Sequence, residues 1–257
     1  MGILNVTADS FSDGGRYLDP SAALDQALRL VEAGAAIVDV GGESTRPGAV
    51  PVPVEVELRR VIPVVRALAS LRVVVSVDTS KPEVMRAALD AGAGMINDVR
   101  ALRDPGALQA VAGSGAAVCL MHMQGEPATM QREPVYGDVV TEVKAFLEVQ
   151  VQSCLQAGIA RDRIALDPGF GFGKTLAHNL QLLRALPRLV APGYPVLVGL
   201  SRKSMIGALT ERPVGDRLAG GLALALWAVQ GGASIVRTHD VGPTIDAISA
   251  WSAVSGG

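Results

Sequence analysis

The feature that most constrains the fold is an alternation of short apolar runs with longer amphipathic segments along the whole chain. The apolar runs are expected to form strands near residues 2–6, 36–40, 73–77, 95–97, 116–121, 164–166, 196–200 and 234–236. The segments between them are expected to form helices near residues 21–33, 53–70, 82–91, 105–112, 138–157, 177–189, 214–230 and 242–254. Strands that alternate with helices in this way indicate βαβ units and a parallel sheet.

The number of these units selects an architecture. Eight strand–helix units in 257 residues are typical of a (β/α)8 TIM barrel. An open doubly wound sheet is the alternative, and eight alternations favour the barrel. No proline-rich or serine-rich linker divides the chain, so we expect one domain over residues 1–257.

Composition narrows the class of protein. The net charge of -2 argues against broad nucleic-acid binding, which relies on basic surface. Cys119 and Cys154 form no disulfide framework and fit a reducing cytosol, so we expect a cytoplasmic protein. The first residues lack the basic region and the long apolar core of a signal peptide, so none is expected. The longest apolar stretch, residues 218–229, contains two glycines and is too short to span a bilayer. Its apolar circumference suggests a buried or subunit-facing helix, and therefore a homodimer.

Polar side chains follow every expected strand. Active sites of such barrels lie at the carboxyl ends of the strands, so these side chains are expected to converge there. They are Asn5, Asp39, Asp78, Asn97, His122, Asp167, Lys203, and Arg237 with His239. Helix capping can explain one or two of them but hardly a full ring, which favours a ligand site. His122 could instead be a hydrogen-bonded core histidine.

The last strand ends in a cation and an imidazole on one face. Strand side chains alternate, so Arg237 and His239 point the same way and could bind an anion. The alternative is that Arg237 pairs with Asp240 as a structural clasp.

Two polar, glycine-rich segments follow the first two strands. Residues 9–15 place Phe11 among hydroxyls and carboxylates and are expected to form a mobile loop. Residues 41–48 hold Arg46 before a Pro-Gly turn. That guanidinium could close over a phosphate, or it could be a solvated turn residue.

Two later segments carry further chemistry. Residues 167–175 superficially suggest a nucleotide-binding P-loop, but Gly169 and Gly173 enclose three residues where that motif needs four. Asp167 followed by two phenylalanines better suits a flat ring held by a carboxylate between aromatic walls. Residues 201–204 place two cations where a helix begins, which makes sense if an anionic or electron-rich ligand binds there.

Taken together and in order, these segments closely resemble the dihydropteroate synthase family. The motifs that carry the resemblance are residues 2–7, 9–15, 42–48, 76–79, 96–98, 120–122, 167–172, 201–204 and 237–240. The resemblance implies a transferase that joins 6-hydroxymethyl-7,8-dihydropterin diphosphate to 4-aminobenzoate and releases diphosphate by a dissociative substitution. It also implies a Mg²⁺ cofactor, small-molecule substrates and a homodimer.

The resemblance further implies a role for each matching position. The expected pterin residues are Asp78, Asn97, Met121, Asp167, Phe172, Gly199 and Lys203. Asn5, Arg237 and His239 are expected to bind diphosphate, and Asn5 is also the expected magnesium ligand. The expected 4-aminobenzoate residues are Phe11, Thr45, Arg46 and Ser204. The catalytic roles are expected to fall to Lys203, Asp78, Asp167, Arg237 and His239.

The chain departs from the family pattern in two loops. Ala8 stands where proline is usual, and residues 100–102 lack the usual glycine-containing turn. Two other classes remain as alternatives. A pterin-binding methyltransferase domain should not need residues 201–204 or the Arg237/His239 pair, and a non-catalytic paralogue is disfavoured because the loop motifs and that pair are present.

Overall fold

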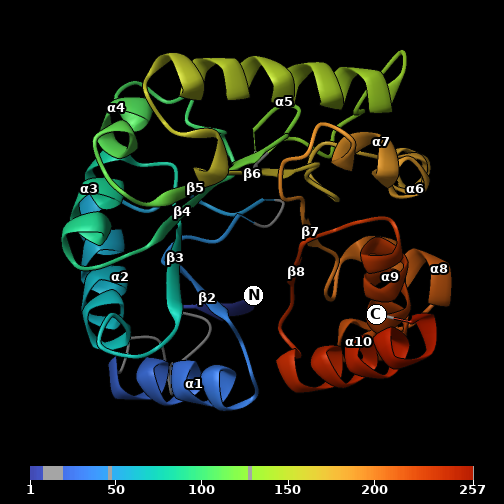
Figure 1. Ribbon diagram of the computed structural model, residues 1–257, viewed down its shortest axis with the longest axis horizontal. Helices are drawn as coiled ribbons and strands as arrows, with labels where there is room; N and C mark the ends of the chain where they lie inside the picture. The colour runs from blue at the N-terminus through green and yellow to red at the C-terminus, as the bar shows by residue number, and fades with distance from the viewer. Residues whose placement is uncertain (8–19, 46–47, 127–128, 257) are drawn as a thin grey trace.

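The strands form a parallel ring at the centre of the molecule. The computed structural model describes residues 1–7, 20–45, 48–126 and 129–256 (Figure 1). Its strands are β1 (Gly2–Asn5), β2 (Ile37–Gly41), β3 (Val74–Asp78), β4 (Met95–Asp98), β5 (Ala117–Met121), β6 (Ile164–Asp167), β7 (Leu197–Gly199) and β8 (Ile235–Arg237). Strands β1 to β6 pair in sequence order, and β7 pairs with β8.

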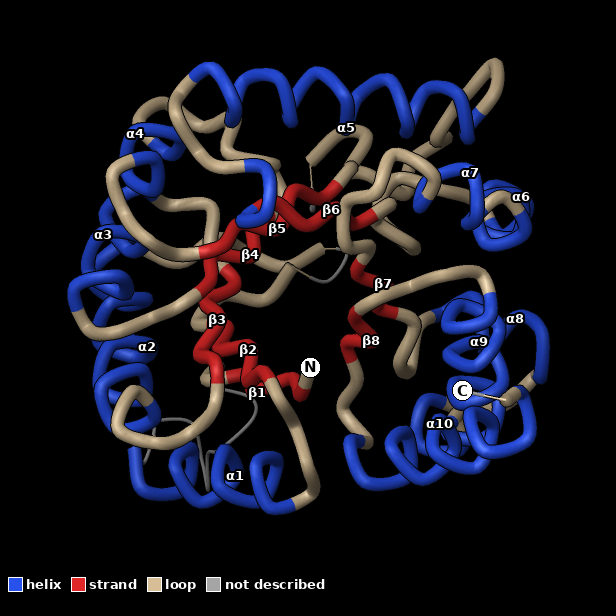
Figure 2. Tube along the Cα trace, viewed as in Figure 1, coloured by secondary structure: helices blue, strands red, loops and turns tan. Residues whose placement is uncertain are grey.

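Single bridges close this ring. Leu166 at β6 bridges to Val196 just before β7, and Gly2 in β1 bridges to Thr238 just after β8. The Ile3 amide donates to the Thr238 carbonyl at 3.0 Å, which joins the last strand to the first. Figure 2 shows the strands inside and the helices around them. The predicted (β/α)8 barrel is therefore confirmed, with its weakest pairing on either side of the β7–β8 pair.

The helices form the outer layer. They are α1 (Pro20–Glu32), α2 (Val54–Leu68), α3 (Pro82–Asp90), α4 (Ala107–Ala112), α5 (Val139–Gln156), α6 (Leu176–Arg184), α7 (Leu186–Val190), α8 (Ser204–Thr210), α9 (Leu218–Gln230) and α10 (Val241–Ser255). The inward stripe of α2 shows why they pack on the strands. Val61, Val64, Val65 and Leu68 recur at helical spacing and are buried. No helix in the described residues is long and apolar enough to cross a membrane.

The expected helix over residues 177–189 is divided into α6 and α7. Pro187 has no amide hydrogen and cannot donate to the carbonyl of Leu183, one turn earlier. The indole Nε1 of Trp227 on α9 donates to that carbonyl at 3.3 Å. The break is thus a proline effect compensated by a neighbouring helix. The segment 214–230 is also divided, into a short 3₁₀ turn at Val214–Asp216 and α9.

The turn after β4 adopts a glycine-like backbone without glycine. Ala101 and Leu102 have φ angles of 54° and 59°, a left-handed conformation that is unfavourable for side chains with a Cβ. Asp98 compensates, because its carboxylate accepts the amides of Arg100 at 2.8 Å and Leu102 at 2.7 Å. The unusual sequence of this turn therefore leaves the end of β4 in place.

Candidate active site

Side chains from β2, β3, β4 and β8 meet in a buried network of charged and polar groups. Arg237 Nε donates to Asp39 Oδ2 at 2.6 Å, and Arg237 Nη2 donates to Asp78 Oδ2 at 2.9 Å. Asn97 Nδ2 donates to the same Asp39 oxygen at 3.0 Å, while Ser76 Oγ donates to Asp39 Oδ1 at 2.6 Å. Both oxygens of Asp39 are therefore partnered, and Arg237 is locked between two carboxylates.

This network rules out one of the two interpretations of Arg237 that the sequence left open. The expected clasp between Arg237 and Asp240 is wrong, because Arg237 pairs with Asp39 and Asp78 instead. Asp240 is paired with Arg202 at 2.6 Å. The residue that sequence reasoning left without a role is Asp39, which is fully buried. The sequence does contain a feature that could have indicated this role: Asp39 is an acid in the middle of a buried strand, where an unpaired carboxylate would cost free energy.

Asp78 is the least satisfied acid of this network. Its Oδ1 is buried and has no hydrogen-bond partner in the described structure. Burial raises the pKa of Asp78 to about 7, although the charge of Arg237 opposes this shift. A buried carboxyl with one unpartnered oxygen is suited to accept or share a proton with a ligand amide or amino group.

The opposite side of the barrel mouth contains Asp167 and Lys203. Burial raises the pKa of Asp167, which ends β6 and accepts the Gly169 amide at 2.7 Å. Lys203 donates to the Phe170 carbonyl and lies 4.8 Å from the centre of the Phe172 ring. Burial lowers the pKa of Lys203 to about 8. This side therefore offers an acid, a proton donor and an aromatic face.

The remaining expected pterin residues lie on the adjoining strands. Met121 is buried, pairs with Asp167 in the β5–β6 register, and joins a buried apolar cluster with Phe172 packed against it. Gly199 pairs with Arg237 in the β7–β8 register. A Cβ on Gly199 would lie 3.8 Å from Arg237 Cβ and 4.0 Å from Lys203 Nζ, so glycine leaves space beside both cations.

The expected anion-binding residues are brought to one edge. Asn5 ends β1, pairs with Gly41 and is half-buried. A Cβ on Gly41 would lie 3.7 Å from both Asn5 Oδ1 and Asp78 Cβ, so these two side chains flank that glycine. His239 is half-buried, and its Nδ1 lies 3.0 Å from Ser201 Oγ.

The fit of these residues to magnesium rests on oxygen donors. Mg²⁺ prefers oxygen ligands and usually keeps substrate phosphates and waters around one or two protein groups. Among the described residues, no group of three His, Cys, Asp or Glu side chains could hold a metal. The Asn5 amide oxygen, which flanks Gly41 together with the Asp78 side chain, nevertheless fits a site completed by a diphosphate.

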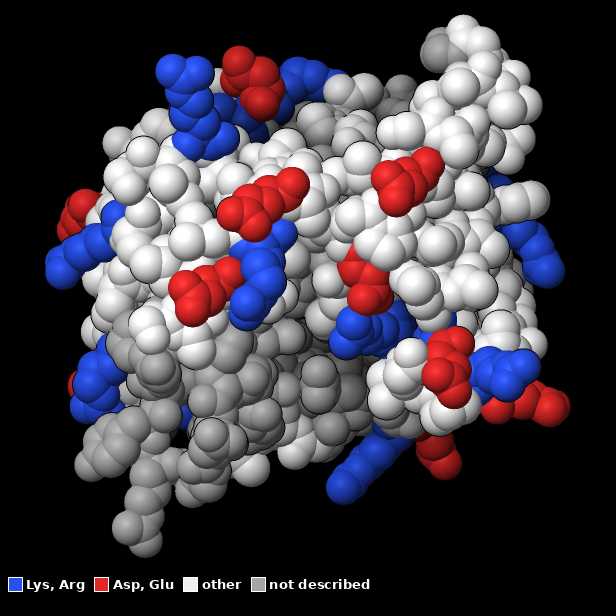
Figure 3. Space-filling model, turned by 90° about the horizontal axis from the view of Figure 1, so that it is seen from below, with Lys and Arg blue, Asp and Glu red and all other residues white. Residues whose placement is uncertain are grey.

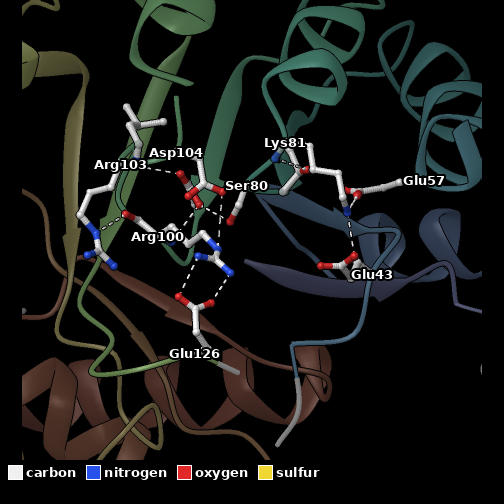
Figure 4. A network of polar contacts seen from close by, with 11 residues as sticks. Glu43, Glu57, Ser80, Lys81, Arg100, Arg103, Asp104 and Glu126 are labelled. Atoms are coloured by element: carbon white, nitrogen blue, oxygen red, sulfur yellow. Dashed lines mark hydrogen bonds and ion pairs between the residues drawn. The ribbon is translucent and has the colours of Figure 1, made fainter. Parts of the chain in front are cut away.

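The loop after β2 is tied down by an ion-pair clasp that sequence reasoning missed. Figure 4 shows Lys81, the residue just before α3, reaching between Glu43 of this loop and Glu57 of α2. Glu43 Oε2 accepts Lys81 Nζ at 2.7 Å and the Val52 amide at 2.7 Å, which joins both ends of the loop. Burial lowers the pKa of Lys81, but the hydrogen bonds to both glutamates outweigh it and raise the pKa.

One of the expected 4-aminobenzoate residues, Thr45, belongs to the loop that this clasp holds. Thr45 is half-buried two positions beyond Glu43, and Ser204 is the exposed first residue of α8. Phe11 and Arg46 lie outside the described residues. Figure 4 also shows Arg100 and Glu126, which link the loops after β4 and β5 in the same manner.

His122 is a hydrogen-bonded core histidine, as the alternative from the sequence allowed. It is buried, and its Nδ1 lies 2.9 Å from Lys174 Nζ. Burial and the neighbouring Lys174 lower the pKa of His122 to about 3. It therefore stays neutral at physiological pH and is not positioned as an anion-binding group.

Comparisons with known proteins agree with this geometry. The family described as pterin binding enzyme matches residues 1–239. Dihydropteroate synthase of Escherichia coli K12 is 55% identical over 249 residues, which cover 96% of this chain and 88% of the relative. The corresponding protein of Haemophilus influenzae is 50% identical over 99% of this chain and 93% of its own length.

Solved structures show the same relationship. The Xanthomonas albilineans dihydropteroate synthase with 4-aminobenzoic acid is 56% identical with a TM-score of 0.94, covering 100% of this chain and 92% of that one. The Yersinia pestis enzyme in a sulfonamide complex is 50% identical with a TM-score of 0.93, covering 99% and 93%. The motif-based prediction is confirmed, and this chain belongs to the dihydropteroate synthases, transferases of the pterin-binding enzyme family.

Proposed function

We propose that the enzyme joins 6-hydroxymethyl-7,8-dihydropterin diphosphate to 4-aminobenzoate and releases diphosphate. The observation that carries this proposal is the buried, unpartnered oxygen of Asp78 opposite Asp167, Lys203 and the Phe172 ring. A pterin is flat and carries amino and ring N–H donors as well as a carbonyl acceptor. Two acids, one ammonium and an aromatic face match that pattern.

Each residue then has a defined task. Asp78, Asn97 and Asp167 hold the pterin edge, while Lys203 donates to the pterin carbonyl. Met121, Phe172 and Gly199 shape the slot. Asp78 and Asp167 also stabilise positive charge that develops on the pterin as diphosphate departs.

The reaction balances without a covalent intermediate on the protein. The bond between the pterin methylene carbon and the diphosphate oxygen breaks, and its electron pair leaves with diphosphate. The 4-aminobenzoate nitrogen then bonds to that carbon and loses a proton to solvent or diphosphate. Asn5, Arg237 and His239 hold the diphosphate, and Arg237 acts as a fixed charge because Asp39 and Asp78 orient it. Bound Mg²⁺ would supply charge neutralisation for the departing diphosphate, with Asn5 as its protein ligand.

The second substrate would bind beside the loop that Lys81 secures. We propose Thr45, Arg46, Phe11 and Ser204 as the 4-aminobenzoate residues, on the basis of their motifs. We also propose that residues 1–257 act as one pterin-binding domain in the cytoplasm.

The proposed reaction is tested by product formation. The protein, Mg²⁺, the pterin diphosphate and 4-aminobenzoate are mixed, and dihydropteroate is detected by mass spectrometry. Omission of either substrate should abolish the product. A methylated product from a methyl-donor cosubstrate, without dihydropteroate, would favour the methyltransferase alternative instead.

A homodimer through the late helices completes the proposal. Only Ala225 and Ala228 of α9 are buried, whereas Leu218 and Trp227 are 41% and 53% exposed. Ile245 on the neighbouring α10 is 36% exposed. An apolar helix that its own barrel leaves uncovered is suited to a subunit interface. Light scattering at micromolar concentration should report a dimer for the wild type and a shift toward monomer for Trp227→Glu.

A further inference from the structure

Lys174 is a buried cation that the proposed reaction does not use. It directly follows the glycine-rich segment after β6 and is 3% exposed. Its Nζ lies 2.9 Å from His122 Nδ1 and 3.2 Å from the His122 carbonyl oxygen. It also donates to the carbonyls of Gly169 at 2.8 Å and Phe172 at 3.0 Å. None of these partners is a carboxylate.

An ammonium in this position acts as an internal cation. It has donors and no acceptor, so backbone carbonyls and the imidazole lone pair can all point at it. His122 must therefore present an unprotonated Nδ1 to Lys174. Burial lowers the pKa of Lys174 to about 7, although the charge of Asp167 opposes this shift.

The backbone around Lys174 leaves little freedom. Gly169 and Gly173 have φ angles of 68° and 60°. A Cβ on Gly169 would lie 1.8 Å from the His122 carbonyl oxygen, and one on Gly173 would lie 2.3 Å from that of Gln124. The loop after β6 is therefore pressed against the backbone after β5. Without a central cation, the carbonyl oxygens that converge there would repel one another.

This loop carries two of the proposed pterin residues. The Gly169 amide donates to Asp167 Oδ1 at 2.7 Å, and Gly169 also supplies a carbonyl to Lys174. Phe172 supplies another carbonyl to Lys174 and presents its ring to Lys203. The Lys174 ammonium thus binds the backbone of Phe172 directly and is linked to Asp167 through Gly169.

We propose that Lys174 is a positioning residue for the pterin: its ammonium fixes Asp167 and Phe172 without contacting the substrate. This inference rests on the proposed pterin roles of those two residues. A purely structural lysine would stabilise the fold but would leave the pterin affinity of the folded protein unchanged.

The first test compares binding of the two substrates. Lys174→Met keeps an unbranched side chain that is one atom shorter and removes its donors. We expect the Kd of a non-reactive pterin, measured by calorimetry, and the KM for the pterin diphosphate to rise about tenfold. At saturating pterin diphosphate, the KM for the arylamine substrate should change less than about twofold. Lys144→Met is the matched control, because Lys144 is an exposed residue of α5 paired with Glu148. An unchanged pterin Kd in folded Lys174→Met, even with a lower Tm, would overturn the proposal.

The second test restores the missing cation. Lys174→Ala should regain pterin affinity when propylammonium is added, whereas propan-1-ol of similar size should have no effect. A pterin Kd that is raised in Lys174→Ala and unaffected by the amine would exclude the ammonium as the cause. Should that variant fail to fold, the Kd of Lys174→Met decides.

Asp167→Asn separates the two levels of inference. If it weakens pterin binding while Lys174→Met does not, the positioning role is wrong and the pterin site stands. If neither variant weakens binding, both assignments are wrong.

Discussion

Two sides of the barrel mouth hold their cations in opposite ways. On the carboxylate side, Arg237 and Lys81 each contact two acidic side chains. On the carbonyl side, Lys203 and Lys174 donate to backbone carbonyls of the loop after β6. Figure 3 shows that charges of both signs are interspersed on the surface seen in that view.

The kind of partner, carboxylate or carbonyl, decides which of these cations can lose its charge near physiological pH. Burial lowers the pKa of all four, but acidic partners more than offset it for Arg237 and Lys81. Carbonyl dipoles do not, so the pKa falls to about 8 for Lys203 and about 7 for Lys174. The cations of the carboxylate side therefore keep a fixed charge, whereas the lysines of the carbonyl side titrate near physiological pH.

Removing the fixed charge should have the largest effect. Arg237→Met leaves the fully buried Asp39 without its cation, which we expect to lower the free energy of unfolding by about 3–5 kcal/mol and to abolish synthesis. Urea denaturation at pH 7 measures the loss. Arg202→Met is the matched control, since its exposed pair with Asp240 should contribute less than about 1 kcal/mol. Equal stability of the two variants would show that the carboxylate side does not depend on Arg237.

The corresponding change on the carbonyl side should affect turnover more than stability. Lys203→Ala removes the proposed donor to the pterin carbonyl, and we expect kcat/KM to fall about 10²–10³-fold. The Tm should stay near that of the wild type, because no acid is left unpaired. If Lys203→Ala melts early and its folded fraction turns over normally, the role assigned to Lys203 is wrong.

The two sides should also differ in their response to pH. Burial lowers the folded-state pKa of Lys203 to about 8, below its ordinary value of 10.5, so the unfolded chain binds more protons between those values. Stability relative to Lys203→Met should therefore rise from pH 8 to about 10.5, with a slope below about 1.4 kcal/mol per pH unit.

Asp78 on the carboxylate side should show the opposite sign. Burial raises its folded-state pKa from 3.8 to about 7, so the folded protein binds more protons in that window. Stability relative to Asp78→Asn should fall as pH rises from about 4 to 7. Two difference curves of the same sign, measured by urea denaturation across these windows, would contradict the comparison.

The sequence was sufficient to locate the carboxylate side and the carbonyl side of the barrel mouth, because residues of both sides stand at the ends of buried strands. Apolar runs followed by Asp78, Asn97 and Asp167 place those side chains at one end of a parallel barrel whatever their partners are. The resemblance then assigned roles to them. Strand bounds differ from those expected by about one residue, for instance at Leu197–Gly199, since strand termini depend on pairing that the sequence does not display.

Partner choice was not predictable in the same way. Asp240 is close to Arg237 in sequence, yet the guanidinium pairs with Asp39, which is 198 residues away. The surroundings of Lys174 depend on left-handed glycines and on the backbone after β5, neither of which a motif records. Such contacts form only when distant strands are brought together, so they require the three-dimensional structure.

The smallest predicted effect concerns the second cation of the carboxylate side. Lys81→Met breaks the clasp that holds Glu43, so the loop carrying Thr45 should become less ordered and the KM for 4-aminobenzoate should rise about three- to tenfold. The pterin Kd should stay unchanged, because Glu43 and Glu57, the acidic partners of Lys81, are not among the residues proposed to hold the pterin. The buried Glu57 would also lose its cation and lower stability, so Lys81→Met/Glu57→Gln is the better-matched variant. Steady-state kinetics with each substrate varied in turn gives the KM for 4-aminobenzoate and the KM for the pterin diphosphate separately. A rise in the pterin KM equal to that for 4-aminobenzoate would mean that the two sides of the barrel mouth are not independent.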